Sequence, residues 1–473
     1  MLQKIPSLLS LISLRPFDTS NEGGRSKERY RRAALTTMAS VIAKAIALLT
    51  GLISVPLTFR YLGAERYGIW MVLVSIVAAM GFADLGIGNG LMNAVSEAYG
   101  KDDRPLAREY VTSAFALMLC IAAFLAVAGA VGYPLLPWLR LFNVKSGAVA
   151  AEGAKAFLVL YGSFVVSIPL GVITRAQAGL QKAYASQIVS ALGNILSLGA
   201  MLVVIWMHAS LAWLVFASVF GGIAATVFNG WFLLWQHPWL APSWHAFRRR
   251  SANKILKLGL MFFVMQCAFA VGYTSDNIVI AQVLGAAAVA AYAVPQKLFS
   301  VIPMLVSMGI APLWPAYGEA LARGDVAWMR KTFLSSLWLA LAITVPLCAL
   351  LVLTGPWILR LAVGKSLHAP MSLLITLAVW GVVNAVSGVI AVLLNGTGVL
   401  KALTVTSVFA SLSNVALSIL FTRRLGVMGV CLGSIVTQVL ITFPICFVLI
   451  RFLFRRLATE KTQSGLGEPA SLV

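Results

Sequence analysis

Residues 62–116 read LGAERYGIWMVLVSIVAAMGFADLGIGNGLMNAVSEAYGKDDRPLAREYVTSAFA, and this stretch decides the fold. After a short Leu-Gly-Ala turn, a run of mostly apolar residues extends from Gly68 to Met92. A charged turn from Glu97 to Glu109 separates this run from a second one, which begins at Tyr110. Because about 20 apolar residues cross a bilayer as a helix, the stretch predicts two membrane spans joined by a charged loop.

The same pattern returns 222 positions further along the chain, where Leu62-Gly63-Ala64 recurs as Leu284-Gly285-Ala286. At this offset three residues of the charged turn also recur, Glu97 as Glu319, Asp103 as Asp325 and Arg108 as Arg330, and Ser113 in the following run recurs as Ser335. Later in each half, Gly179-Leu180-Gln181-Lys182 resembles Gly398-Val399-Leu400-Lys401. The chain is therefore predicted to contain two copies of one membrane unit.

The composition supports a membrane protein with helical spans. The chain of 473 residues is 60% hydrophobic and only 11% charged, whereas soluble proteins carry about 25% charged residues. Its formal net charge of +21 comes from Lys and Arg that mostly lie between apolar runs, as the positive-inside rule predicts, so we expect a lipid bilayer around the chain and no nucleic-acid partner. The five cysteines show no paired spacing and the four histidines form no ligand cluster, so no metal site and no cofactor are expected.

The predicted fold is all-α, with about twelve transmembrane helices in two parallel six-helix repeats around a central cavity. The first six spans are expected at about 36–59, 68–92, 110–131, 154–177, 184–207 and 211–235, and the second six at about 255–281, 290–316, 331–354, 370–394, 402–422 and 427–450. The expected parts are an N-terminal tail at 1–35, an N-lobe at 36–235, a linker at 236–254, a C-lobe at 255–451 and a tail at 452–473.

Positive charge divides the loops into two classes. The turn at 97–109 and the linker with Arg248–Arg250 are rich in Lys and Arg, whereas the alternate loops carry few. The positive-inside rule therefore puts both termini and the linker in the cytoplasm. Halves with an even number of spans have the same orientation, which makes the repeats parallel.

The sequences LGAERYGIW and FADLGIGNGLMNAVSEAYGKDD resemble bacterial oligosaccharide flippases of the Wzx type, within the multidrug/oligosaccharidyl-lipid/polysaccharide exporter superfamily. The resemblance covers most of Thr36–Arg451, including LNGTGVLKA at 394–402. It implies a V-shaped, non-enzymatic transporter of the bacterial inner membrane. Such proteins move polyprenyl-pyrophosphate-linked oligosaccharide to the outer leaflet for O-antigen, capsule or exopolysaccharide synthesis. Polysaccharide polymerase and glycosyltransferases are the implied partners.

Four charged residues stand out inside the predicted spans: Lys44, Asp84, Asp276 and Lys297. Charge in a span is costly and is functional by default. Their depths along the helices predict that Lys44 meets Asp84 near the inner side and that Lys297 meets Asp276 near the outer side. In one interpretation the lysines bind pyrophosphate, and the carboxylates pair with them or carry a coupling ion. In the other, each is a structural pair, or Lys297 reaches the headgroups.

Three arginines border the spans. Arg60 and Arg66 are expected at the outer mouth and Arg175 at the inner end of the fourth span. Each could steer an anionic headgroup, or could be an interfacial anchor.

Other functions remain as alternatives. A cation-coupled drug exporter of the same superfamily would favour an acidic cavity, whereas this chain places two lysines beside two aspartates. A glycan polymerase or ligase needs acids or bases near the membrane surface, and the longest outer loop, 132–153, holds only the carboxylate of Glu152. A scaffold for a synthesis complex would not need an internal repeat.

Overall fold

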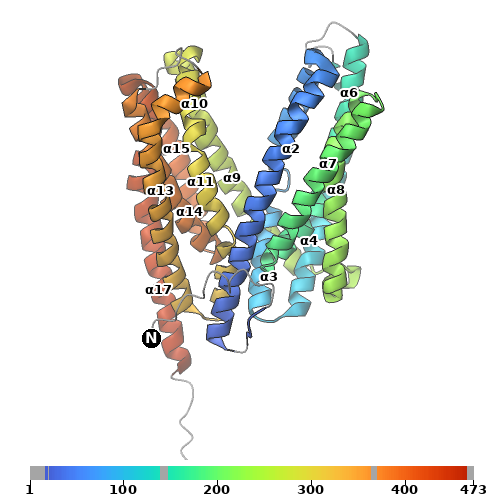
Figure 1. The fold of residues 1–473 in the computed structure, drawn as a ribbon. Helices are drawn as coiled ribbons and strands as arrows, with labels where there is room; N and C mark the ends of the chain where they lie inside the picture. The colour runs from blue at the N-terminus through green and yellow to red at the C-terminus, as the bar shows by residue number, and fades with distance from the viewer. Residues whose placement is uncertain (1–15, 20, 139–146, 364–369, 466–473) are drawn as a thin grey trace, which may run out of the picture. The chain divides into compact units, whose positions relative to one another are not determined.

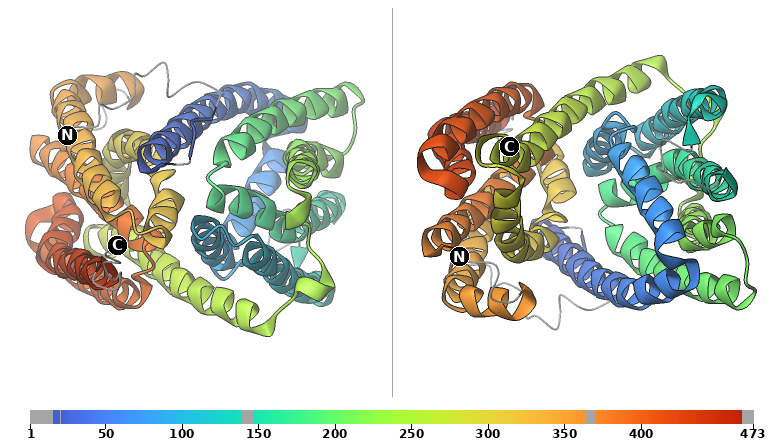
Figure 2. Two further views of the ribbon diagram at one scale, coloured as in Figure 1. Left: turned by 90° about the horizontal axis from the view of Figure 1, so that it is seen from below. Right: turned by 90° about the horizontal axis from the view of Figure 1, so that it is seen from above.

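The computed structural model describes residues 16–19, 21–138, 147–363 and 370–465, which form helices and turns with no strand among them. The chain divides into two compact units, Met1–Leu260 and Met261–Val473, called here the N-terminal and C-terminal units. Within each unit the helices run side by side along their lengths (Figures 1 and 2). The expectation of an all-α fold is therefore confirmed.

Within its described residues, the N-terminal unit contains five long helices, a short one and the start of a further long one. They are α2 (Glu22–Ala79), α3 (Ile87–Gly100), α4 (Arg104–Gly132), α6 (Gly147–Gly179), α7 (Ala183–Trp206), α8 (Leu211–Gln236) and the start of α9 (Arg249–Leu284). Three 3₁₀ turns complete it: η1 (Tyr133–Leu135), η2 (Pro238–Leu240) and η3 (Trp244–Ala246). Its core includes Leu91, Val95 and Ala114, which are fully buried.

The C-terminal unit begins within α9. It continues with α10 (Ala286–Phe299), α11 (Val301–Ile310), α12 (Leu313–Ala322), α13 (Val326–Val363), α14 (Met371–Gly396), α15 (Leu400–Leu425), η5 (Gly426–Met428), α16 (Gly429–Thr437), the π-helical turn η6 (Gln438–Thr442) and α17 (Phe443–Gly465). Its core includes Ile280, Leu374 and Val430.

Eleven segments of the described chain are long and apolar enough to cross a membrane. The last of them, Leu400–Leu457, is 58 residues long and contains two passes. After the turn at Gly426, α16 runs back along α15, because Ser418 Oγ donates to the Val430 carbonyl (3.3 Å) and Asn414 Nδ2 donates to Ser434 Oγ (2.8 Å). Counted as passes, the described helices therefore agree with the predicted number of about twelve.

The internal repeat is visible in the backbone of both predicted turns. Gly63 interrupts α2 at φ 72° and ψ 173°, and Gly285 precedes α10 at φ 90° and ψ 159°. Glycine is favoured at such positive φ because it has no Cβ. The two Leu-Gly-Ala turns therefore have the same backbone geometry.

The two charged turns, at 97–109 and 319–331, have equivalent backbone hydrogen bonds. Asp103 N–H donates to the Ala98 carbonyl at 3.0 Å, and at the shifted position Asp325 N–H donates to the Ala320 carbonyl at 2.9 Å. The ion pairs repeat as well, with 2.8 Å between Lys101 and Glu97 and 2.8 Å between Arg323 and Glu319. The two-repeat fold predicted from the 222-residue shift is therefore confirmed.

The alignment of the later turn needs a correction of two residues. Gln181 (φ 57°) and Gly398 (φ 73°) take equivalent positions, since Lys182 N–H donates to the Gln177 carbonyl (2.8 Å) just as Val399 N–H donates to the Leu394 carbonyl (3.1 Å). The sequence comparison matched glycine to glycine. The conformation that requires positive φ falls on Gln181 in the first half and on a glycine in the second.

The segment predicted as a linker, 236–254, packs on the N-terminal unit. Arg108 Nε donates to the Ala241 carbonyl at 2.9 Å, and Ser251 Oγ donates to Glu109 at 3.1 Å. Leu240 is 1% exposed. The boundary between the compact units lies later, inside α9 at Leu260.

Candidate functional site

Asp84 lies in a break between two helices. The apolar run at 68–92 was predicted as one span, but α2 ends at Ala79 and α3 begins at Ile87. Leu85 (φ 49°) and Gly86 (φ 70°) take the left-handed conformation, and Asp84 Oδ1 accepts the Gly86 N–H at 2.9 Å. A short carboxylate that bonds the backbone two residues on favours a turn over a helix. The prediction of one continuous helix here is wrong.

Arg175, on α6, reaches this break. Its Nη1 donates to Asn89 Oδ1 at 2.8 Å. A Cβ on Gly88 would lie 3.0 Å from both Arg175 Nε and Asp84 Oδ2, so the missing side chain lets the guanidinium and the carboxylate approach each other. The structure thus groups Asp84 with Arg175, which the sequence had placed in separate hypotheses.

The predicted lysine–aspartate pairs are not found. The Lys44 and Lys297 side chains are exposed, and neither forms an ion pair among the described residues. The four residues were paired by depth along their helices, but depth does not fix the direction in which a side chain points. Each lysine is therefore available to an external anion.

The two arginines expected at the outer mouth, Arg66 and Arg60, differ from each other. Arg66 Nε donates to Glu152 Oε2 at 2.8 Å, and Glu152 also accepts the Leu211 N–H at 2.9 Å, so this pair joins α2, α6 and the start of α8. Arg60 is exposed. Arg66 therefore has an anchoring role in this conformation, whereas Arg60 has an open charge.

Asp276, on α9, borders a cavity of about 340 Å³ within the C-terminal unit. It is 6% exposed, and its Oδ2 accepts the hydroxyl proton of Tyr292 at 3.0 Å. Among the residues that the structure describes, its Oδ1 has no hydrogen-bond partner. The polar residues that line the cavity are Asn384, Ser387, Ser407, Ser411, Asn414, Ser434, Thr437, Gln438 and Thr442. An open carboxylate oxygen among uncharged polar groups can take a proton or a small cation.

A second cavity, of about 500 Å³, lies within the N-terminal unit and is lined by no charged residue. Its floor includes Asn229, whose Oδ1 accepts from Gln177 Nε2 at 2.9 Å and whose Nδ2 donates to Gln177 Oε1 at 2.8 Å. Ser186 Oγ also donates to Gln177 Oε1. These amides satisfy one another, so the cavity offers a neutral polar surface.

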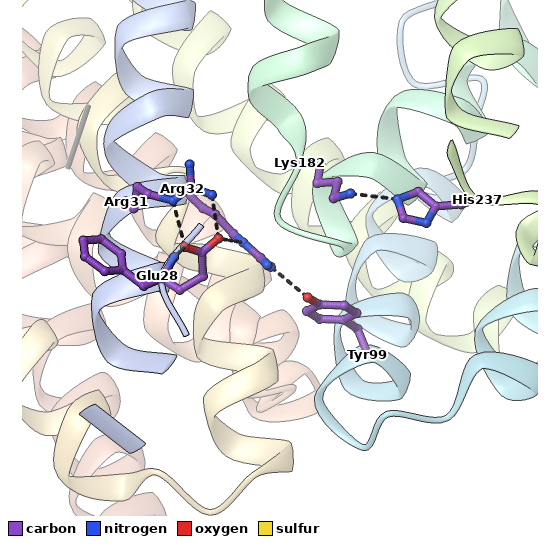
Figure 3. A network of polar contacts seen from close by, with 7 residues as sticks. Glu28, Arg31, Arg32, Tyr99, Lys182 and His237 are labelled. Carbon is purple, nitrogen blue, oxygen red and sulfur yellow. Dashed lines mark hydrogen bonds and ion pairs between the residues drawn. The ribbon is translucent and has the colours of Figure 1, made fainter. Parts of the chain in front are cut away.

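The end of the N-terminal unit at which the charged turn lies is called here the charged end. Sequence reasoning missed a cluster of polar side chains there. Buried Glu28 accepts from Arg31 Nη2 (2.7 Å) and Arg32 Nε (2.8 Å), and Arg32 Nη1 donates to the Tyr99 hydroxyl at 2.9 Å (Figure 3). Glu28 and its two arginines had been assigned to a tail. The i, i+3 and i, i+4 spacing of Glu28 with the arginines was the available signal.

Solved structures of MATE transporters have the same fold. A MATE in complex with MaD3S superimposes with a TM-score of 0.74 at 18% identity, over 91% of this chain and 97% of that one. A transporter of the MOP superfamily from Pyrococcus furiosus superimposes with a TM-score of 0.76 at 16% identity, over 90% and 96% of the two chains. The chain therefore has the two-repeat fold of these membrane transporters.

The family follows from sequence. Residues 33–321 match the family described as polysaccharide biosynthesis protein, and residues 262–420 match MatE. A protein of Yersinia pseudotuberculosis named for O-antigen export is 22% identical, over 81% of this chain and 87% of its own length. A Salmonella typhimurium protein named for O-antigen transport is 22% identical, over 85% and 93%. The chain belongs to the polysaccharide biosynthesis protein family, and the resemblance to the Wzx type is confirmed.

Proposed function

We propose that this protein is a flippase that moves polyprenyl-diphosphate-linked oligosaccharide from the cytoplasmic to the outer leaflet of the bacterial inner membrane. It is a multi-pass membrane protein of polysaccharide transport. The observation that carries the proposal is the family match over residues 33–321, together with relatives named for O-antigen export that align with most of the chain. Alternating access would expose the substrate site to each leaflet in turn, without catalysis by the protein.

The charged end is proposed to face the cytoplasm. Lys101, Lys182 and Lys254 lie there, as does the Arg248–Arg250 run. Positive charge of this density is typical of cytoplasmic loops. Both termini are proposed to lie on the same side, where the lipid-linked substrate is made.

Lys44, Lys297 and Arg60 are the proposed contacts for the diphosphate. Their side chains are exposed and form no ion pair among the described residues, so an incoming anion need not displace a carboxylate. Charge-assisted hydrogen bonds to a diphosphate are about twice as strong as neutral ones. Arg66 and Arg175 are proposed to bind the diphosphate only after they release Glu152 and Asn89, respectively.

Asp276 is the proposed carrier of the coupling ion. The Tyr292 hydroxyl fixes one carboxylate oxygen, and the other is left for a proton or a monovalent cation in the polar cavity. Asp84 is proposed to neutralise Arg175 instead of a lysine.

A cation-coupled exporter of drugs or other small molecules is the second candidate. It is favoured by the MatE match at 262–420, a segment that contains Asp276 and most of the residues that line its cavity. A membrane polymerase or ligase has less support, because the described residues hold no group of three or more potential metal ligands and the relatives are named for transport.

The test is complementation of a strain that lacks its own flippase. The chain, expressed with the enzymes of its own glycan pathway, should restore surface polysaccharide and reduce accumulated lipid-linked oligosaccharide in the inner leaflet. The double variant Lys44→Gln/Lys297→Gln should fail at equal membrane abundance, whereas the matched surface change Lys257→Gln should succeed. Raised resistance to cationic drugs without restored polysaccharide would support the second candidate instead.

A further inference from the structure

The charged end gathers four basic groups from four separate elements. Arg32 lies on α2, Arg104 at the start of α4, Lys182 in the turn before α7 and His237 directly after α8. Figure 3 shows the Lys182 side chain pointing at the His237 ring and Arg32 pointing at Tyr99. The Arg104 guanidinium carbon lies 5.9 Å from the centre of the Trp239 ring.

The nearby carboxylates already have partners. Glu28 accepts from Arg32, and Glu97 forms 2.8 Å ion pairs with Lys101 and Lys254. Asp103 accepts the Leu106 N–H at 2.9 Å as the cap of α4, and Glu109 accepts from a serine. Across the described ranges of the chain, none of these acids forms an ion pair with the lysine before α7 or with the arginine that begins α4.

The contact between Lys182 and His237 shows how this charge is held without an anion. Lys182 Nζ lies 2.7 Å from His237 Nε2. An ammonium has only donors, so a charged Lys182 requires a neutral imidazole that accepts at Nε2. Burial, followed by the charge of Arg32, lowers the pKa of Lys182. Burial, followed by the charges of Lys182 and Arg104, lowers the pKa of His237.

We infer that Lys182, His237 and Arg104 form a capture site for a diphosphate ester at the cytoplasmic face of the N-terminal unit, a site that extends the flippase function proposed above. Several acceptor oxygens of one diphosphate would meet the ammonium, the guanidinium and the imidazole together. Trp239 holds the arginine in place through its ring face. The anion stabilises the imidazolium, so His237 takes up a proton when the ligand binds.

The site has no equivalent in the C-terminal unit. The residue that corresponds to Lys182 in the repeated turn is Val399. The residue that corresponds to Arg104 under the 222-residue shift is Val326. Fold symmetry therefore does not require these charges, and the lysine–histidine contact is not needed to form the turn.

The first experiment measures the pKa of His237 in the full-length protein in detergent, by NMR of histidine labelled with ¹³C and ¹⁵N. His237→Gln assigns the resonance. Inorganic pyrophosphate should raise the pKa of His237 by about one unit. Lys182→Gln should weaken pyrophosphate binding about tenfold, and Lys257→Gln, the same change at an exposed lysine of the same unit, should not. Equal binding by the two variants, or an unmoved His237, overturns the inference. Size-exclusion profiles confirm that each variant is folded.

The second experiment identifies the source of the phosphate groups. In phosphatidylcholine nanodiscs, added polyprenyl diphosphate should reproduce the shift, whereas phosphatidylglycerol should not. An equal shift with phosphatidylglycerol overturns the assignment to a diphosphate. Neither measurement requires transport. A protein that binds pyrophosphate through Lys182 but does not flip contradicts the proposed function alone, and one that flips with His237 unmoved contradicts this inference alone.

Discussion

The two units share their turns, including the ion pairs of the charged turns, but they differ in the charges at Asp84, Arg175 and Asp276. In the N-terminal unit, Asp84 and Arg175 approach each other across Gly88 at a break between helices. The equivalent residues of the C-terminal unit are Val306, Val392 and Ile310. There α11 runs through the position at which the N-terminal unit breaks. The repeated fold therefore accommodates either two charged side chains or two apolar ones, and the charges of the N-terminal unit need a separate explanation.

The opposite asymmetry appears at Asp276. Its equivalent in the N-terminal unit is Ser54, whose hydroxyl bonds the carbonyl of Gly51 in its own helix. A buried carboxylate with an open oxygen is expensive, whereas a serine that bonds its own helix is not. We therefore propose that anion binding belongs mainly to the N-terminal unit and ion coupling to the C-terminal unit, and the following variants test that division.

The largest effect is expected from Asp276→Asn. The amide keeps the shape of the side chain but cannot carry a coupling proton or cation. Export driven by an imposed ion gradient should fall about 10- to 100-fold, the range of ordinary coupling free energies. The matched control is Asp102→Asn in the charged turn of the other unit, where asparagine accepts the positive φ of 55°. Undiminished gradient-driven export by the Asp276 variant would remove the coupling role.

Gly88→Val tests the approach of Asp84 and Arg175. The new side chain must displace a guanidinium and a carboxylate that each lie 3.0 Å from its Cβ position. Overpacking of this kind costs about 2 kcal/mol and should lower the thermal unfolding midpoint in detergent. Gly199→Val is the control, because open space surrounds its Cβ position on α7 and only the helix propensity changes. Equal midpoints for the two variants would show that the approach is not important.

A double-mutant cycle isolates the Asp84–Arg175 interaction. Asp84→Val and Arg175→Val should each destabilise the protein, whereas the double variant, which copies the apolar C-terminal arrangement, should recover about 1 kcal/mol relative to their sum. The unfolding free energies of the wild type, the two single variants and the double variant are measured by chemical denaturation in detergent. Strict additivity would mean that the two charges are independent.

The smallest effect concerns Glu97, which lies on α3 outside the membrane spans. Burial works to raise the pKa of Glu97, but hydrogen bonds from Lys101 and Lys254 hold the pKa below its ordinary value. A depressed carboxylate pKa stabilises the fold above the unfolded value of about 4.3, and this contribution is lost as pH falls through the folded pKa. Because Glu97 is 38% exposed, the loss should stay below about 1 kcal/mol after solvent screening. Melting curves of the wild type and Glu97→Gln should differ at pH 6 and converge near pH 3.

The turns were predictable because the residues that determine each turn are close together in the sequence. Gly63 and Gly285 mark the first pair of turns, and the capping residues Asp103 and Asp325 mark the second. A single offset therefore identified the repeat without any knowledge of packing. The helix break at Asp84 was missed because no proline announces it, and the run from Gly68 to Met92 is apolar enough for one span.

The sites were harder to predict because their members lie far apart in sequence. Lys182 and His237 are separated by 55 positions, and the contact of Arg175 with Asn89 joins positions 86 apart. Such contacts depend on how helices rotate and pack. Depth along a helix gave Lys44 the wrong partner for the same reason. Composition indicated that charge in the spans is unusual, but it could not show which charges face each other.

Leaflet accessibility in proteoliposomes tests the central claim most directly. Purified protein is reconstituted with a fluorescent polyprenyl-diphosphate oligosaccharide, and an impermeant quencher reports the fraction in the outer leaflet over time. The account predicts that wild-type protein equilibrates the lipid between leaflets and that Lys44→Gln/Lys297→Gln protein does not, while Lys257→Gln matches the wild type. If the lipid stays in its original leaflet although the wild-type protein is folded and inserted in the membrane, the account is contradicted.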